Sequence, residues 1–186
     1  MTNFPSRALH DVGLAAWFGG TLANAVSLNR AAAETGRFSD AGRVTNAGWD
    51  AWTPVNAAAI GLHVIGSIGL LAGNAGRVAG QKGVAGMTVT KTALTVAALA
   101  VTGYSRLLGR RVAARHDVPV ASGTEPTEAT PPEVARAQQQ LRALQWAVPA
   151  LTGALVVVTS YAGEQQRPTA VKAGVVQRLI GAKQKG

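Results

Sequence analysis

The stretch AAAIGLHVIGSIGLLAG, residues 57–73, decides the fold, because only His63 and Ser67 within it carry polar side chains. A helix on the surface of a soluble protein would show polar residues on one face, at every third or fourth position. About 20 mostly apolar residues form a helix long enough to cross a bilayer. The stretch therefore predicts a transmembrane helix.

Three further apolar runs lie before and after this stretch. We place the four spans at about residues 12–28, 54–75, 84–108 and 144–163. The chain is 47% hydrophobic but only 5% aromatic, and it holds 22 glycines. Glycine weakens helices in water, whereas membrane helices tolerate it. The sequence thus predicts an all-α integral membrane protein whose residues 1–165 form a bundle of four transmembrane helices.

Two amphipathic segments accompany the spans. A helix is expected to open at residues 130–133, after a flexible linker at about 117–131, and to continue into the fourth span with a kink at Pro149. Its apolar face holds Val134, Ala137, Leu141 and Leu144. Residues 166–186 form a basic tail, in which residues 171–180 predict a second amphipathic helix lying in the headgroup region.

The ends of the spans carry recognisable signals. Thr53 and Pro54 favour a helix start, with a hydroxyl cap followed by proline at the first helical position. Aromatic side chains favour the membrane interface. If all four runs span, one interface receives a belt of aromatic residues, namely Trp49, Trp52, Tyr104 and Trp146.

Location and orientation are harder to assign. The bias toward Ala, Gly, Val and Arg is typical of a GC-rich bacterial genome, so we expect the bacterial plasma membrane. The 18 Lys and Arg residues divide nine to nine between the two sides, which leaves the positive-inside rule undecided. We favour cytoplasmic termini, because a basic tail suits the anionic inner leaflet. An alternative for the first run is a signal peptide cleaved after Ala25.

The charge and the motifs exclude several classes of function. The net charge is +9, but the basic residues flank the apolar runs, which favours anionic lipid headgroups over nucleic acid as the partner. Without cysteine, the chain has no disulfide, thiolate chemistry or iron–sulfur cluster. No hydrolase, metalloprotease, Walker or dinucleotide motif is present. The sequence therefore predicts neither an enzyme nor a bound cofactor or metal.

Small residues repeat at a spacing that suits close helix packing. Gly69 and Gly73 form a GxxxG motif in the second span, and Gly19 and Gly20 close two small-xxx-small pairs in the first. Such pairs place flat spots on one helix face. We interpret them as packing surface within the chain, with association to another protein's helix or to a second copy as the alternative.

Ionisable residues inside predicted spans are costly and point to function by default. A polar cluster is expected at one membrane face from Asp11, Lys91 and Glu164, with His63 deeper. An Asp11–Lys91 ion pair would offset the cost of burying either charge. The alternative is that Lys91 reaches the headgroups alone and that Asp11 caps a helix. A haem held by His10 and His63 is disfavoured, because the predicted spans place the two at different depths.

Two functions from different classes follow. The first is a non-catalytic accessory or scaffolding protein that packs against other membrane subunits. The second is a small transporter or proton- or ion-conducting protein built around Asp11, Lys91 and His63. Substrate, partner and oligomeric state do not follow from the sequence.

Overall fold

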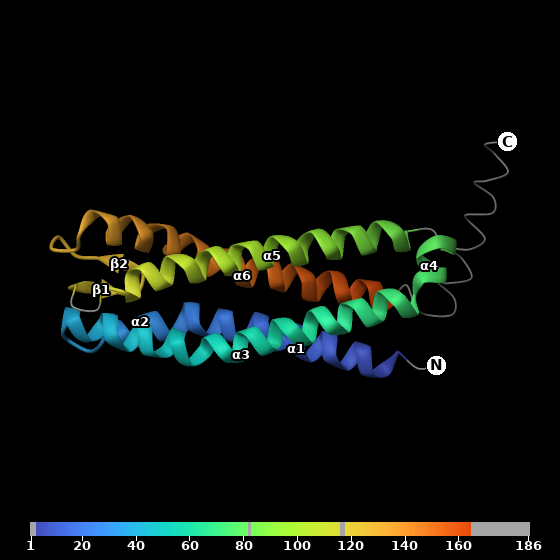
Figure 1. The fold of residues 1–186 in the computed structure, drawn as a ribbon, viewed down its shortest axis with the longest axis horizontal. Helices are drawn as coiled ribbons and strands as arrows, with labels where there is room; N and C mark the ends of the chain where they lie inside the picture. Colours follow the sequence, from blue (N-terminus) through green and yellow to red (C-terminus); the bar gives the residue numbers. More distant parts are fainter. Residues whose placement is uncertain (1–2, 82, 116–117, 165–186) are drawn as a thin grey trace.

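The computed structural model of the chain describes residues 3–81, 83–115 and 118–164, and this part is almost entirely helical (Figure 1). The basic tail 166–186, with its predicted amphipathic helix, lies outside the described residues. The long helices lie side by side along the longest axis of the molecule (Figure 1).

The N-terminal helix begins earlier than the apolar run predicts. Helix α1 (Phe4–Ala23) continues through one π-helical turn, η1 (Asn24–Leu28), into α2 (Asn29–Ala33). Pro5 lies in the first turn, where its fixed φ suits a helix start and its missing N–H costs nothing. The helix thus begins before the predicted span, and His10 and Asp11 lie inside the helix.

The predicted helix start at Thr53 and Pro54 is wrong. Helix α3 runs without a break from Phe38 to Gly73, with Pro54 in its interior. Proline cannot donate to the carbonyl four residues earlier, but a helix held on both sides by packing tolerates the loss. The Thr53 hydroxyl donates to the Trp49 carbonyl at 2.7 Å instead of capping a helix end. Much of the expected polar connection before residue 53 is thus helical.

The second half of the chain again contains two long helices that run in opposite directions. A short helix, α4 (Ala75–Gly80), leads to α5 (Val84–Ala113), and Gly83 before it has a φ of +86°. Two short antiparallel strands follow, β1 (Val120–Ser122) and β2 (Glu125–Pro126). Helix α6 (Pro132–Glu164) then runs back with Pro149 inside it. The helix expected before the fourth span and the span itself are one continuous helix.

The stretch expected to be a flexible linker contains the two strands and is tied to the helices. Strand β1 packs on α3, and Val120 and Ser122 are buried. The hydroxyl of Thr130 donates to the Pro119 carbonyl at 2.7 Å, and the Gln138 amide donates to the Ser122 carbonyl at 3.0 Å. Composition does not register such hydroxyl and amide bonds to the backbone, which is why the Pro, Thr and Glu content favoured a linker.

The helices are packed in the order α3, α1, α6, α5. Helix α1 has its largest contact with α3 and also lies against α6, and α5 packs on α6. Helices α3 and α5 have few contacts with each other, so the fourth side of the bundle is loosely closed. The first turn of α1 and the last turn of α6 lie at one end, and α2 and the strands lie at the other (Figure 1).

Three helices, α3, α5 and α6, are long and apolar enough to cross a membrane. At 1.5 Å per residue, the 36 residues of α3 extend over about 54 Å, well beyond the ~30 Å of a hydrocarbon core. The apolar runs of these helices, residues 57–73, 84–108 and 144–163, lie toward the end that holds the first turn of α1 and the last turn of α6 (Figure 1).

The outer surface of the bundle is apolar and the interior is small. A buried cluster joins Trp17, Ala59, Ala98 and Val148, one residue from each of the long helices. Large apolar side chains point outward instead, among them Ile65, Ile68, Val89, Val96 and Val157. This inversion of a soluble protein's pattern fits a bilayer as the surrounding solvent.

Candidate functional site: a cavity between α3 and α5

A cavity of about 260 Å³ lies between α3 and α5 on the loosely closed side of the bundle. Its walls come from α3, α5 and α6, and Gly123 and Thr124 between the two strands line one end. Apolar side chains such as Ile60 and Val148 line the end toward the apolar half of the bundle. The lining of the cavity therefore combines polar and apolar side chains.

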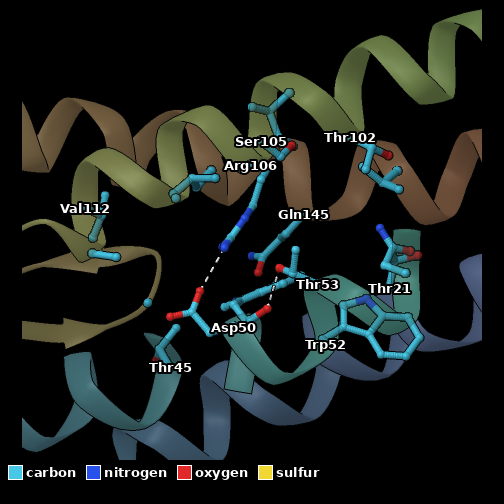
Figure 2. A pocket seen from close by; sticks show the side chains of 18 of the residues that line it. Thr21, Thr45, Asp50, Trp52, Thr53, Thr102, Ser105, Arg106, Val112 and Gln145 are labelled. Carbon is cyan, nitrogen blue, oxygen red and sulfur yellow. Dashed lines mark hydrogen bonds and ion pairs between the residues drawn. The ribbon is translucent and has the colours of Figure 1, made fainter. Parts of the chain in front are cut away.

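An ion pair crosses the cavity. Figure 2 shows Arg106 reaching from α5 to Asp50 on α3, and their closest nitrogen and oxygen are 2.9 Å apart. Both side chains are partly exposed, at 37% for Arg106 and 62% for Asp50, so the pair contributes little to stability. Its consequence is positional, because it links two helices that otherwise scarcely touch.

Several polar side chains of the lining are satisfied within the protein. Thr21 donates to the Trp17 carbonyl at 2.7 Å, and Asn29 donates to the Gln145 amide oxygen at 2.6 Å. These bonds fix the side chains of α1 and α6 next to the cavity.

Four other polar atoms of the lining are buried without a hydrogen-bond partner. They are the indole nitrogen of Trp52, the amide oxygen of Asn56, and the hydroxyl oxygens of Thr45 and Thr102. Buried polar groups in proteins are nearly always paired, so each such atom calls for an explanation. Thr102 on α5 faces the cavity from the side opposite Trp52 on α3 (Figure 2).

The aromatic residues predicted to form a belt have different surroundings. Trp49 and Trp52 line the cavity, and the Trp52 ring lies against Gly20. The Tyr104 hydroxyl donates to the Gln140 amide oxygen at 2.7 Å, and Trp146 is 50% exposed. The belt stays a prediction, but two of its four members also belong to the cavity.

The structure brings His10 and His63 into direct contact, with ring centroids 4.5 Å apart. Both side chains are fully buried. The assignment of these residues to different depths is therefore wrong: α1 begins at Phe4, so His10 lies well inside the bundle. No porphyrin fits between two rings that touch each other in this way.

Hydrogen bonds orient both imidazole rings. His10 Nδ1 donates to the Asp11 carboxylate at 2.7 Å, and His63 Nδ1 donates to the His10 carbonyl at 3.3 Å. His63 Nε2 is 3.4 Å from the Thr95 hydroxyl, whereas His10 Nε2 is buried without a partner. The histidine pair thus connects α1, α3 and α5, and His10 joins the predicted cluster as a member that sequence reasoning placed elsewhere.

Asp11 and Lys91 both act electrostatically on this histidine pair. The Asp11 carboxylate attracts the Lys91 ammonium, although its contact among the described side chains is with His10. Lys91 lies two turns inside α5, and Glu164 is the last residue of α6, at the same end of the bundle (Figure 1). The Asp11–Lys91 ion pair is thus a long-range attraction here.

We expect Asp11 and Lys91 to be energetically coupled. Replacing Asp11 with alanine leaves the Lys91 ammonium without its nearest anion, so D11A should lower stability, and the loss should shrink once Lys91 is also alanine. Because Asp11 is half exposed, the coupling should lie near the lower end of the roughly 0.5–3 kcal/mol seen between neighbours. Thermal unfolding in detergent of both single variants and the double variant measures it. Additive losses would show that the two charges do not interact.

The predicted packing glycines divide into two groups. A Cβ on Gly69 would collide with Ser6, one on Gly73 with Asn3, and one on Gly20 with Trp52, so these three allow α1 and α3 to approach. Gly19 has nothing within 4 Å of a Cβ. The interpretation as packing within the chain fits the first three and not Gly19.

Comparison with known protein families, with curated proteins and with solved structures finds no match to this chain.

Proposed function

We propose that this protein is a non-catalytic, four-span membrane protein that holds an amphiphilic molecule of the bilayer in the cavity between α3 and α5. In this role it serves as an accessory component of the bacterial plasma membrane. The observation that carries the proposal is the cavity itself. It is open between two apolar helices, and its largely apolar lining includes the polar side chains of Asp50, Arg106 and Gln145.

The fourth crossing is proposed for α1, which is not among the three helices that are long and apolar enough to cross a membrane by themselves. Helix α1 lies against α3 along its whole length, so a membrane that surrounds α3 also surrounds α1. Its polar residues His10 and Thr21 are buried and therefore shielded from lipid. The contact is marked by close pairs from end to end: Asn3 with Gly73, His10 with Gly66, Gly20 with Trp52, and Leu28 with Gly48.

The size of the cavity limits what enters it. Sites for drug-sized ligands measure roughly 300–1,000 Å³, and this one, at about 260 Å³, suits a headgroup rather than a whole lipid. The weak contact between α3 and α5 lets an attached hydrocarbon chain pass outward into the bilayer. An amphiphile would thus bind by its headgroup and keep its tail in the membrane.

Filling the cavity should remove the bound amphiphile. Gly109 lies on the face of α5 that lines the cavity, and a Cβ there has open space around it. We expect G109L to lower the occupancy of a co-purified lipid at least severalfold, as measured by native mass spectrometry after extraction in mild detergent. Gly86, on the same helix and equally unobstructed but away from the cavity, supplies the matched control G86L. Equal occupancy in all three proteins, or no adduct in any, would refute the proposal.

A further inference from the structure

A groove of about 530 Å³ runs between the C-terminal part of α5 and the N-terminal part of α6, at the end of the molecule that holds the strands (Figure 1). Two bonded pairs mark its ends. The Tyr104 hydroxyl donates to the Gln140 amide oxygen at 2.7 Å, and Arg115 lies 3.4 Å from the Glu133 carboxylate. At the usual rise of a helix, Tyr104 and Arg115 are about 16 Å apart along α5. The groove is therefore long enough for the headgroup of a phospholipid.

The groove carries an excess of positive charge. Its lining holds Arg111, Arg115 and Arg136 against a single carboxylate, that of Glu133. Glu133 pairs with Arg115, but the two side chains are 61% and 58% exposed, so this pair is weak. Within residues 3–81, 83–115 and 118–164, neither Arg111 nor Arg136 forms an ion pair. Two exposed guanidinium groups from different helices thus line one groove without an anion to neutralise them.

The position of the groove along the helices relates it to the membrane. Its floor is apolar, because Leu108, Val134 and Ala137 are buried beneath it. Arg111 lies about 5 Å along α5 from the end of the apolar run at residue 108. The headgroup region of a bilayer is roughly 5–8 Å thick on each side of the hydrocarbon core. Arg136 lies farther out, but a long arginine side chain extends toward the interface. With α5 and α6 crossing the bilayer, the groove opens at the headgroup layer.

We propose that this groove binds one anionic phospholipid by its phosphate group, which Arg111 and Arg136 hold from α5 and α6. A guanidinium group presents paired N–H donors that match two phosphate oxygens. Basic pockets between transmembrane helices suit anionic headgroups for this reason. Exposed Tyr104 and Leu107, at the end of the groove nearest the apolar run, offer a surface for the acyl chains that a soluble phosphate lacks. This site is separate from the cavity between α3 and α5.

A matched pair of variants distinguishes a site from a diffuse positive charge. Arg110 is the neighbour of Arg111 on α5 and is also exposed, but it does not line the groove. R110Q and R111Q therefore remove the same charge at nearly the same depth. We expect R111Q and R136Q each to lower the affinity for dioleoylphosphatidylglycerol about tenfold, because each loses a charge-assisted hydrogen bond. R110Q should keep the wild-type affinity.

A third variant should act in the opposite direction. The Glu133 carboxylate repels a phosphate in the groove and occupies Arg115. E133Q removes the repulsion and releases the Arg115 guanidinium group, so it should bind dioleoylphosphatidylglycerol more tightly than the wild-type protein. A change that merely disturbed the fold would weaken the binding instead.

The test uses three probes on the purified full-length protein in mild detergent. They are dioleoylphosphatidylglycerol, dioleoylphosphatidylcholine and glycerol phosphate. The choline lipid has the same acyl chains and the same phosphate, but its fixed cation is repelled by the arginines, so it should bind at least severalfold more weakly. Glycerol phosphate supplies the headgroup without acyl chains and should bind more weakly still. Native mass spectrometry reports the bound lipids, and thermal shift reports all three probes.

Each outcome decides the inference. Equal losses for R110Q and R111Q, or equal affinity for the two lipids, overturn it. Binding of glycerol phosphate as tight as that of the glycerol lipid overturns the lipid as the ligand. The preference for the anionic lipid should persist in G109L, in which the cavity between α3 and α5 is filled. Its loss there would assign the lipid to that cavity, which would leave the proposed function standing and reject the groove.

Discussion

Replacing Trp17 with alanine is expected to destabilise the protein by about 3–5 kcal/mol, the usual cost of truncating a buried large aromatic residue. Trp17 is fully buried, and its neighbours in the central cluster, Ala59, Ala98 and Val148, come from the three other long helices. Two of these neighbours are alanines, which are too small to fill the space that the indole leaves. In a bilayer, packing is the main force between helices, so the contacts are lost without replacement.

Two further variants serve as controls for W17A. Trp146 is 50% exposed, so W146A should change the free energy of unfolding by less than about 0.5 kcal/mol. W17F keeps most of the apolar volume and removes an indole N–H that is buried without a partner, so its cost should be clearly smaller than that of W17A. Unfolding in increasing SDS measures all three. Similar losses for W17A and W146A would contradict the observed core.

The membrane character of the chain could be predicted from sequence because it depends on single segments. Residues 57–73 are apolar whatever surrounds them, and their length alone predicts a span. The structure shows three helices of this kind. Helix α1 is different, since some of its polar side chains, such as His10 and Thr21, are buried by the other helices, and burial is not visible in one segment.

Helix ends were predicted less well, because the same local signal has two structural outcomes. Thr53 and Pro54 at the head of an apolar run would begin a helix if the preceding residues were irregular. Here the preceding residues are held in α3, in part by contacts such as Gly48 with Leu28 of η1. The error in depth for His10 has the same origin, because the apolar run begins after the helix does.

The cavity could not be predicted, since it exists only through the relative placement of helices. Asp50 and Arg106 are separated by 56 positions and read as flanking charges in the sequence. Asn56 and Thr102 are ordinary polar residues near the edges of apolar runs. Of the cavity residues, Trp49 and Trp52 carried a sequence signal, because both were predicted to be interfacial aromatic residues.

Adding a single methyl group at Gly66 should separate α1 from α3. A Cβ at this position would lie 2.6 Å from the Ser6 carbonyl oxygen and would collide with the backbone of His10. Backbone atoms cannot rotate away as a side chain can, so the helices must move apart. Overpacking of this kind costs about 1–3 kcal/mol, which exceeds the gain of up to about 1 kcal/mol from replacing glycine in a helix. G66A should therefore lower the unfolding temperature in detergent.

Gly61, five positions earlier on the same helix, supplies the matched control. Nothing lies within 4 Å of a Cβ there, so G61A receives the helix gain without the collision and should be neutral or slightly stabilising. Opposite signs for these chemically identical changes would locate the close approach at Gly66, where His10 and His63 meet. If G66A is as well tolerated as G61A, the two backbones are not in contact. The buried histidine pair and the proposed crossing of α1 beside α3 would then both be rejected, because each depends on that contact.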